Sequence, residues 1–275
     1  MAEACIADCL GAGARAVLVE VTEARGSTPR GTDARMVVRG DLCAGTIGGG
    51  QLEFYAIDAA RAMLREGRAA QTLDVPLGPH LGQCCGGHVR LALTLIDAAL
   101  RRKLTASEVR RAARRPELYV LGLGHTGRAL ARALALLPFN TRLIDDRAEV
   151  FGDLPEVCVK SLLADPAEAV AQAAPGAAFV ILTHSHALDY RLAEAALRRG
   201  DAAYTGMIGS ATKRARFEAH FLKSGGTRAM LAHFTCPIGG GVSADKRPEI
   251  IAHLTAGELI GVFARARHAI PMTQS

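Results

Sequence analysis

Two hydrophobic patterns divide the chain into halves. In the second half, short apolar β-rich runs alternate with segments whose apolar residues recur every three or four positions. The runs predict strands at 118–121, 141–145, 178–183 and 203–208, and the periodic segments predict helices at 125–137, 166–174, 188–199, 212–223 and 248–265. Regular alternation of strand and helix predicts an α/β fold, with a Rossmann-like, doubly wound parallel sheet and helices on both faces.

The first half contains more strand-like segments and one clear helix. Its β-rich runs predict strands at 16–22, 35–38, 69–75 and 89–96. Residues 51–66 carry apolar side chains at helical spacing. These elements predict a smaller α+β domain that precedes the Rossmann-like domain.

A basic stretch marks the boundary between the halves. It runs from Arg101 to Arg115, and within it Thr105 and Glu108 form a capping box that predicts the start of a helix. Pro116 ends that helix, because the residue before a proline disfavours helical backbone angles. We expect an α+β domain at 1–100, a basic helical linker at 101–116 and a Rossmann-like domain at 117–275.

Composition narrows the class of protein. The 275 residues are 49% hydrophobic and 22% charged, as in a globular protein with a sizeable core. No aromatic residue interleaves with the basic stretch, which favours a solvated linker over a nucleic-acid surface despite the net charge of +6. The seven scattered cysteines form no disulfide framework, and no apolar run is long enough to span a membrane. We expect a cytoplasmic protein that binds neither nucleic acid nor membrane.

A glycine fingerprint opens the second half. Gly122, Gly124 and Gly127 form a G-x-G-x-x-G that follows a predicted strand and begins a predicted helix. Gly122 allows the tight turn, Gly124 lets a ligand phosphate reach the backbone at the helix N-terminus, and Gly127 lets helix and strand pack. Asp145, at the end of the next strand, is where a ribose-binding acid is expected. The ligand itself stays open, because this fold carries many cofactors.

A second glycine loop lies in the first half. Gly48, Gly49 and Gly50 are followed by Gln51 and a predicted helix. Three consecutive glycines cost backbone entropy, and a nest of N–H groups around an anion would explain them. The alternative is a tight turn that binds no ligand.

The adjacent thiols of Cys84 and Cys85 are the least ordinary feature of the sequence. They lie in the run Gln83-Cys84-Cys85-Gly86-Gly87-His88, where a disulfide between neighbours would be strained. The flanking glycines lack side chains, so a large group can approach. The thiols suit metal ligation, redox chemistry or sulfur transfer. The alternative is that one or both are small buried hydrophobes.

Two histidines follow a predicted strand, at the edge where open α/β sheets bind ligands. In an extended segment His184 and His186 share a face and could hold a ligand or a metal ion. A zinc site would need further ligands, for which Asp189 and His125 are candidates. The sequence contains no nucleophile elbow, zinc-protease motif or kinase motif, so we predict no catalytic residue.

Together these motifs resemble the XdhC/CoxI family. The resemblance covers nearly the whole chain and rests on ordered segments: Glu23–Arg30, Gly45–Glu53, Gln83–Gly87, the glycine fingerprint, Thr183–Tyr190, Gly206–Arg214 and Cys236–Gly239. The chain departs from the family pattern at Gly240-Gly241-Val242-Ser243, where a bulkier apolar residue and an isoleucine are expected. This departure predicts a reshaped loop.

The resemblance implies a molybdenum-cofactor chaperone rather than an enzyme. Such a protein binds the molybdopterin form of the cofactor and holds it while a cysteine desulfurase adds the sulfido ligand. It then passes the cofactor to the molybdenum subunit of xanthine dehydrogenase, and family analogy suggests a homodimer. The two glycine loops, Asp145, the histidines and the thiols are the implied cofactor contacts. The rival is an NAD(P)-dependent oxidoreductase, which explains the fingerprint and Asp145 but not the two thiols. A metal hydrolase built on His184 and His186 is a third reading.

Overall fold

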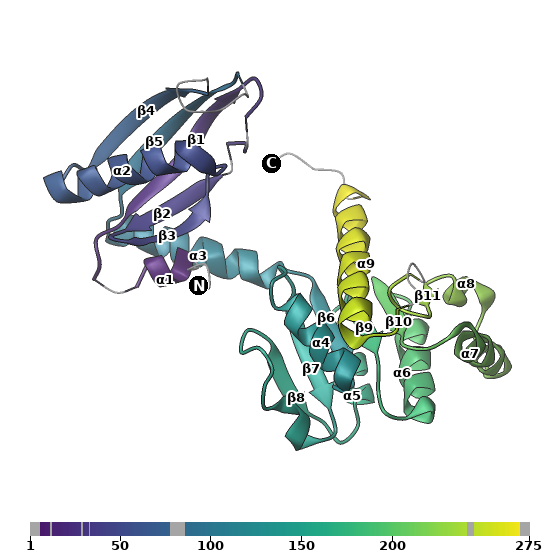
Figure 1. The fold of residues 1–275 in the computed structure, drawn as a ribbon. Coiled ribbons are helices and arrows are strands. Elements are labelled where there is room, and N and C mark those ends of the chain that lie inside the picture. The colour runs from purple at the N-terminus through teal and green to yellow at the C-terminus, as the bar shows by residue number, and fades with distance from the viewer. Residues whose placement is uncertain are drawn as a thin grey trace. The chain divides into compact units, whose positions relative to one another are not determined.

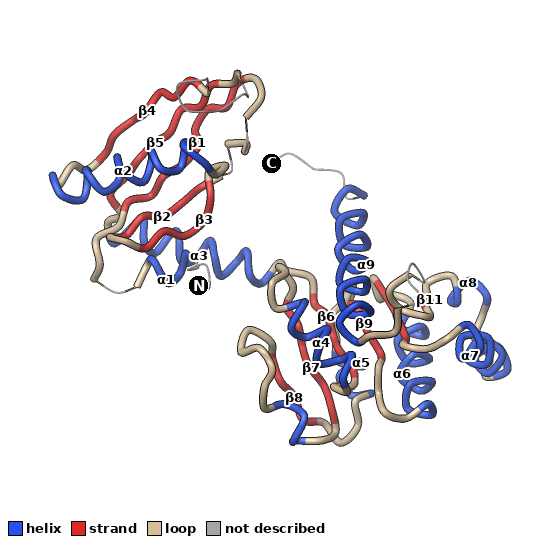
Figure 2. Tube along the Cα trace, viewed as in Figure 1, coloured by secondary structure: helices blue, strands red, loops and turns tan. Residues whose placement is uncertain are grey.

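The chain consists of two compact units, Met1–Ala112 and Ala113–Ser275. The computed structural model describes residues 6–11, 13–28, 30–32, 34–77, 86–240 and 245–269. Figure 1 labels the elements, and Figure 2 separates helices from strands by colour. Each unit has its own sheet and its own hydrophobic clusters, as an independent domain requires.

The first unit is built on a five-stranded antiparallel sheet in the order β3-β2-β1-β5-β4. Successive side chains of β1 point to opposite faces of this sheet. Val17 and Val19 pack on the face that α2 covers, whereas Leu18 joins the cluster formed by α1 and α3. The elements are α1 (Ile6–Cys9), β1 (Val17–Arg25), β2 (Arg35–Arg39), β3 (Leu42–Thr46), α2 (Gly50–Glu66), β4 (Ala70–Pro76), β5 (His88–Leu95) and α3 (Ala98–Ala113).

Helix α3 begins at Ala98, so the predicted start at the Thr105 capping box is wrong. The carboxylate of Asp97 accepts a hydrogen bond of 2.7 Å from the backbone N–H three residues later, which caps the helix there. Leu104 is buried in the first unit, and Arg101 donates to three backbone carbonyls of the segment before β1. These contacts make the first part of the basic stretch a packed element and not a solvated linker.

Strand β3 is an element that the sequence pattern does not predict. It includes Gly45 and Thr46, which the pattern assigned to the glycine loop. A Cβ atom on Gly45 would lie 2.5 Å from the carbonyl oxygen of Arg35 on the neighbouring strand. The close approach of β2 therefore explains why glycine stands at this position.

The second unit confirms the predicted Rossmann-like fold. Six parallel strands run in the order β11-β10-β9-β6-β7-β8. This is the doubly wound order, with its switch point between β6 and β9. The elements are β6 (Glu117–Leu121), α4 (His125–Leu134), β7 (Asn140–Asp145), η2 (Ala148–Phe151), β8 (Val159–Leu162), α5 (Ala167–Gln172), β9 (Ala178–Ile181), α6 (His186–Arg199), β10 (Tyr204–Met207), α7 (Ala211–Lys223), α8 (Arg228–Leu231), β11 (Phe234–Thr235) and α9 (Pro248–Ala269).

Helices cover both faces of this parallel sheet. Helices α4 and α9 share one hydrophobic cluster with the sheet, and α5, α6 and α7 share the cluster on the other face. The sequence pattern does not predict β8, β11 or α8. Strand β8 (VKSL) is not a continuous apolar run, β11 has two residues, and α8 has four, about one helical turn. Within the described ranges, no helix combines the length and the apolar character that crossing a membrane requires.

Candidate functional site

The fingerprint glycines lie at the switch point of the parallel sheet, directly after β6. Gly122 has a φ of 106°, and a Cβ atom there would lie 2.4 Å from the carbonyl oxygen of Leu182. A Cβ atom on Gly127 would lie 2.1 Å from the carbonyl oxygen of Gly122. No atom lies within 4 Å of the same position on Gly124. Two of the glycines therefore permit close packing, and Gly124 leaves the start of α4 open.

A cavity of about 620 Å³ adjoins this open position. That volume lies within the range that holds small-molecule ligands. The first turns of α4, the segment after β7 and the start of α9 supply its walls. Its polar lining is His125, Arg128, Arg132, Arg147 and Glu249, and Leu123, Gly124, Ala129, Val150 and Pro248 complete it.

Asp145 ends β7 as the sequence predicts, but its carboxylate is engaged inside the protein. Its Oδ2 atom accepts hydrogen bonds from Leu123 N (2.7 Å) and Arg147 Nη2 (3.0 Å). Its Oδ1 atom accepts from Arg147 N (3.1 Å) and Arg147 Nε (2.9 Å). Burial by itself raises the pKa of Asp145, but the hydrogen bonds from Arg147 and Leu123 outweigh burial and lower it. This geometry does not favour the predicted role of Asp145 as a ribose- or pterin-binding acid.

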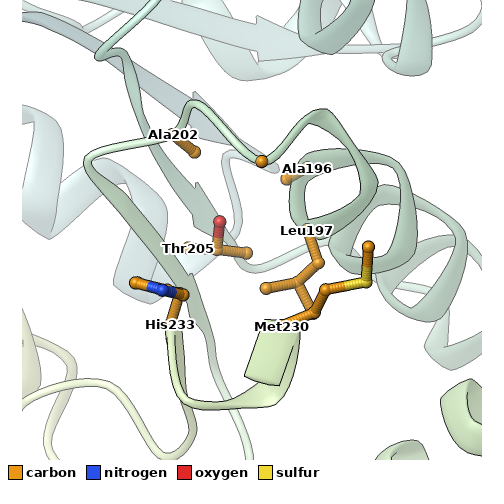
Figure 3. A pocket seen from close by; sticks show the side chains of 7 residues that line it. Ala196, Leu197, Ala202, Thr205, Met230 and His233 are labelled. Atoms are coloured by element: carbon orange, nitrogen blue, oxygen red, sulfur yellow. The ribbon is translucent and has the colours of Figure 1, made fainter. Parts of the chain in front are cut away.

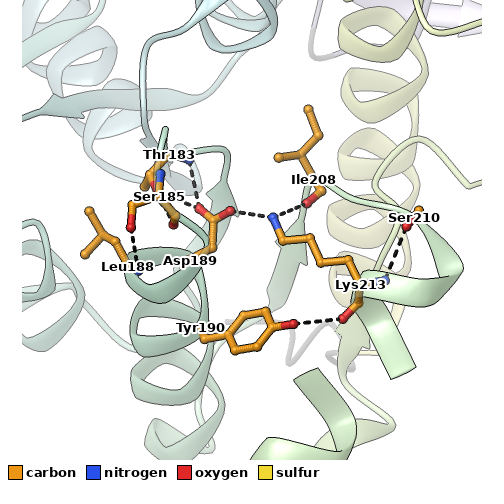
Figure 4. Close-up of polar contacts among 8 residues, drawn as sticks. All are labelled: Thr183, Ser185, Leu188, Asp189, Tyr190, Ile208, Ser210 and Lys213. Atoms are coloured by element: carbon orange, nitrogen blue, oxygen red, sulfur yellow. Dashed lines mark hydrogen bonds and ion pairs between the residues drawn. The ribbon is translucent and has the colours of Figure 1, made fainter. Parts of the chain in front are cut away.

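A buried ion pair fixes the loops at the carboxyl ends of β9 and β10 (Figure 4). Lys213 Nζ lies 2.5 Å from Asp189 Oδ2 and donates to Ile208 O at 2.9 Å. Asp189 Oδ1 accepts from the backbone N–H of Thr183 (2.9 Å) and from its hydroxyl (2.7 Å). Asp189 is completely buried, so these partners replace the water that solvates an exposed carboxylate.

The two histidines do not share a strand face, and this part of the prediction is wrong. Strand β9 ends at Ile181, and His186 is the first residue of α6. The cap of Ser185, which accepts a hydrogen bond from Leu188 N (3.4 Å), begins the helix at this point. Among the residues that can be described, no group of three or more His, Cys, Asp or Glu could hold a metal ion. His184 and His186 stay predicted ligand contacts.

Cys236 lies at the same edge of the sheet, although sequence reasoning did not select it as a site residue. Its thiol is buried, and a Cβ atom on Gly209 would lie 3.2 Å from its Sγ atom. Burial raises the pKa of Cys236 to about 11, although Lys213 acts in the opposite direction. The thiol is therefore protonated near neutral pH and is a weak metal ligand in this state. The altered loop after Gly240 lies outside the described residues.

In the first unit, a side chain of the protein itself occupies the predicted anion nest. Glu53 Oε1 accepts from the backbone N–H groups of Ile47 (2.9 Å), Gly48 (3.3 Å) and Gly49 (2.9 Å). It also accepts from the hydroxyl of Thr46 at 2.5 Å. The nest geometry that the glycines predict is present, but an internal carboxylate fills it. A ligand anion could bind here only by displacing Glu53.

The glycines beside the two adjacent thiols pack against the loop that follows β1. A bridge joins Ser27 to Gly86. A Cβ atom on Gly87 would lie 2.2 Å from the carbonyl oxygen of Ser27, and one on Gly26 would lie 3.3 Å from Gly87 Cα. Two motifs about sixty residues apart in sequence therefore lie side by side. Cys84 and Cys85 lie outside the described residues.

Two smaller cavities in the second unit offer less to a ligand. One, of about 90 Å³, lies beside Thr205, Met230 and His233 near the start of β10 (Figure 3). It has room for a few water molecules and not for a cofactor. The other, of about 370 Å³, lies over β6, β7 and β8 and is lined by Glu117, Tyr119 and Arg142, among others. The cavity of about 620 Å³, called the switch-point cavity below, is larger than these two. It also adjoins the fingerprint loop, so it is the stronger candidate for a ligand site.

Comparisons with known proteins identify relatives of both units. Residues 118–259 match the family model of the XdhC Rossmann domain, and residues 9–75 match that of the XdhC and CoxI family. The Escherichia coli (strain K12) protein YqeB is 28% identical over 94% of this chain, and the chain spans 45% of the length of that relative. A crystal structure described as a xanthine dehydrogenase from Bacillus halodurans has a TM-score of 0.79. That match covers 98% of this chain and 96% of the other at 18% identity, which supports the fold alone.

Proposed function

Because this chain belongs to the XdhC and CoxI family, we propose that it is a chaperone of the molybdenum cofactor. It binds Mo-molybdopterin, holds it for sulfuration by a cysteine desulfurase, and delivers it to the molybdenum subunit of xanthine dehydrogenase. It acts as an accessory protein rather than as an enzyme, and a second copy of the chain completes a homodimer. The observation that carries the proposal is the open cavity at the fingerprint loop, within a domain that matches the family model.

The residues of this cavity fit the phosphate end of the cofactor. Gly124 leaves the N-terminus of α4 accessible, and backbone N–H groups there favour an anion. Arg128 and Arg147 add guanidinium donors to the lining. When bound, the cofactor supplies the molybdenum centre that accepts sulfur. The protein supplies the binding site.

The molybdenum end of the cofactor needs soft ligands such as thiolates. The thiol at the carboxyl edge of the parallel sheet is not ionised. Cys236 is buried, and its raised pKa keeps the thiol protonated. We assign this role to Cys85 and secondarily to Cys84, since thiolates suit molybdenum and can relay sulfur. The motif that carries them is part of the family resemblance.

The rival function is that of an NAD(P)-dependent oxidoreductase. The fingerprint loop favours it, because the same loop binds dinucleotides in many enzymes. The occupied carboxylate of Asp145 weighs against NAD, since an NAD-binding site needs that carboxylate to accept from a ribose hydroxyl, but it does not weigh against NADP.

The first experiment measures what the protein carries. The chain is purified from cells with an intact molybdopterin pathway, and molybdenum is quantified by mass spectrometry and pterin by fluorescence. Replacing Cys84 and Cys85 together with alanine should preserve the circular dichroism spectrum and abolish most of the bound molybdenum. Cys43→Ala is the matched control, since this thiol is a partly buried side chain of β3. Wild-type molybdenum content in the double variant, or micromolar binding of NAD(P), would overturn the assignment.

The second experiment measures delivery. Cofactor-loaded protein, a cysteine desulfurase and a sulfur source are added under air to xanthine dehydrogenase that lacks sulfurated cofactor. The expected result is higher activity than an equal amount of free sulfurated cofactor restores. Equal reconstitution by free cofactor would show that protection and delivery are not the function of the chain.

A further inference from the structure

The switch-point cavity presents Arg147 to a ligand and not the Asp145 that precedes it. Arg147 is part of the cavity lining, and its side chain is 36% exposed. Asp145 is not part of the lining, and its side chain is 2% exposed. In a site that binds an unmodified ribose, the carboxylate at the end of β7 would face the ligand. Here the guanidinium group stands between that carboxylate and the cavity.

The hydrogen bonds of Asp145 leave it no free position for a ribose hydroxyl. An ionised carboxylate has about four acceptor positions. Arg147 fills three of them through its backbone N–H, Nε and Nη2, and Leu123 N fills the fourth. A ribose diol could bind Asp145 only if one of these bonds broke.

Arg147 keeps donors that this pairing does not use. A guanidinium group has five N–H donors, and the ion pair with Asp145 occupies one on Nε and one on Nη2. The fork–fork geometry also fixes the plane of the group, so little side-chain entropy remains to be lost on binding. Among the described residues no hydrogen bond uses the remaining guanidinium N–H groups, so these groups can bind an acceptor-rich anion in the cavity.

Arginines and carboxylates both surround this position. Arg128 and Arg132 also line the cavity, and both lie near the exposed carboxylate of Asp153, at 3.7 Å and 3.3 Å. Asp153 pairs with these two arginines, and Asp145 and Asp146 lie beside Arg147, so the three carboxylates offset the guanidinium charges. None of the three carboxylates lines the cavity. The lining itself carries three guanidinium groups and one carboxylate, that of Glu249.

We propose that Arg147 is the specificity-determining residue of this site, that it binds a phosphate group of the ligand, and that Asp145 positions it. The site therefore selects a phosphate ester over an unmodified ribose diol. This inference rests on the proposed function only in placing the ligand in the same cavity. The phosphate can come from the pterin cofactor or from a nucleotide, and the experiment separates the two sources.

The test compares two probes by isothermal titration calorimetry at low ionic strength. Adenosine 2′,5′-bisphosphate should bind the wild type about ten-fold or more tightly than adenosine 5′-monophosphate, as expected for one or two added hydrogen bonds to a charged group. Arg147→Ala should remove this preference, and Arg147→Lys should restore part of it because the charge remains without the fork. Arg142→Ala is the matched control, since Arg142 lies on β7, the strand that precedes Arg147, and lines the other cavity.

Asp145→Asn tests positioning separately from folding. The proposal predicts that this variant loses the preference between the two probes to the same extent as Arg147→Ala, and that the double variant loses no more. A role of Asp145 in folding alone would change the unfolding temperature but not the ratio of the two affinities. A ribose-binding role would instead weaken binding of the monophosphate and spare the response to the second phosphate.

Two outcomes overturn the proposal: equal affinity for both probes, or absence of binding of either probe to the wild type. Displacement of molybdopterin from loaded protein by the bisphosphate identifies the pterin phosphate as the natural occupant, and simultaneous binding identifies a nucleotide. Protein that carries molybdenum but shows no role for Arg147 refutes this inference and leaves the proposed function standing. Protein that carries no molybdenum but binds the bisphosphate through Arg147 refutes the proposed function alone.

Discussion

Replacing Lys213 with methionine leaves the carboxylate of Asp189 buried without its counter-ion. Asp189 is 0% exposed, and Lys213 Nζ lies 2.5 Å from its Oδ2 atom. Two hydrogen bonds from Thr183 remain, at 2.9 Å and 2.7 Å, but both donors are uncharged. The substitution also removes the donor to the carbonyl oxygen of Ile208. Methionine keeps most of the volume and apolar character of the lysine stem.

The expected cost is about 3–5 kcal/mol, the range measured when one partner of a buried ion pair is removed. A domain is stable by only about 5–15 kcal/mol, so the second unit should lose a large part of its stability. An exposed pair gives the contrasting case. Arg191 and Asp165 lie 2.8 Å apart with side chains 56% and 41% exposed. Arg191→Met should therefore cost about 1 kcal/mol or less.

Urea unfolding followed by tyrosine fluorescence reports mainly on the second unit. The chain has no tryptophan and four tyrosines, of which Tyr119, Tyr190 and Tyr204 lie in the second unit and Tyr55 lies in the first. The double variant that combines Lys213→Met with Asp189→Asn should be more stable than Lys213→Met alone. It no longer buries an uncompensated charge, and coupled sites of this kind interact by about 0.5–3 kcal/mol.

Two results would refute this reasoning. One is a Lys213→Met variant whose free energy of unfolding lies within about 1 kcal/mol of the wild-type value. The other is a double variant that is less stable than Lys213→Met alone. Either would show that Asp189 finds solvent or another partner, and that the ion pair does not fix the loops after β9 and β10.

Three further predictions concern single residues in both units. Glu53→Gln should cost about 1–2 kcal/mol at pH 7 in chemical unfolding, because hydrogen bonds to a charged acceptor weaken. Burial raises the pKa of Glu53 but the nest and Thr46 lower it overall, so the wild type should lose this contribution as the pH falls below about 4.3. Thr141→Val should stabilise by about 1 kcal/mol, since its buried hydroxyl has no hydrogen-bond partner in the described part of the chain. Gly127→Ala should cost about 3 kcal/mol or more, whereas Gly124→Ala should cost about 1 kcal/mol or less, because only the first Cβ meets an atom within 4 Å.

Each of these predictions has its own contrary outcome. Glu66→Gln is the control for Glu53, because Glu66 lies on the same helix with its side chain 57% exposed. Equal pH dependence of the Glu53 and Glu66 variants would show that the nest does not hold a carboxylate in solution. A destabilised Thr141→Val variant would indicate a partner for the hydroxyl, and equal stability of the two glycine variants would refute the packing role of Gly127.

The sequence by itself determined the class of the second unit and the location of its fingerprint loop. Both depend on local signals: the alternation of β-rich runs with helical periods, and glycines spaced around a strand-to-helix turn. The resemblance to the XdhC/CoxI family came from the same short motifs, and the family comparison confirms it. The strands β3, β8 and β11 escaped prediction, because β11 has only two residues and neither β3 (LCAGT) nor β8 (VKSL) is a continuous run of β-rich apolar residues.

Only the tertiary structure decided which polar groups are available to a ligand. Asp145, Glu53 and Asp189 all look like free acids in the sequence, yet each carboxylate is satisfied within the protein. Asp189 meets Lys213 from another helix, 24 residues away, and no local pattern specifies such a pair. Even Arg147, two residues from Asp145, could have pointed elsewhere until the turn after β7 fixed it. A buried charge must find partners wherever the folded chain brings them, and that placement is a property of the packed structure rather than of spacing along the sequence.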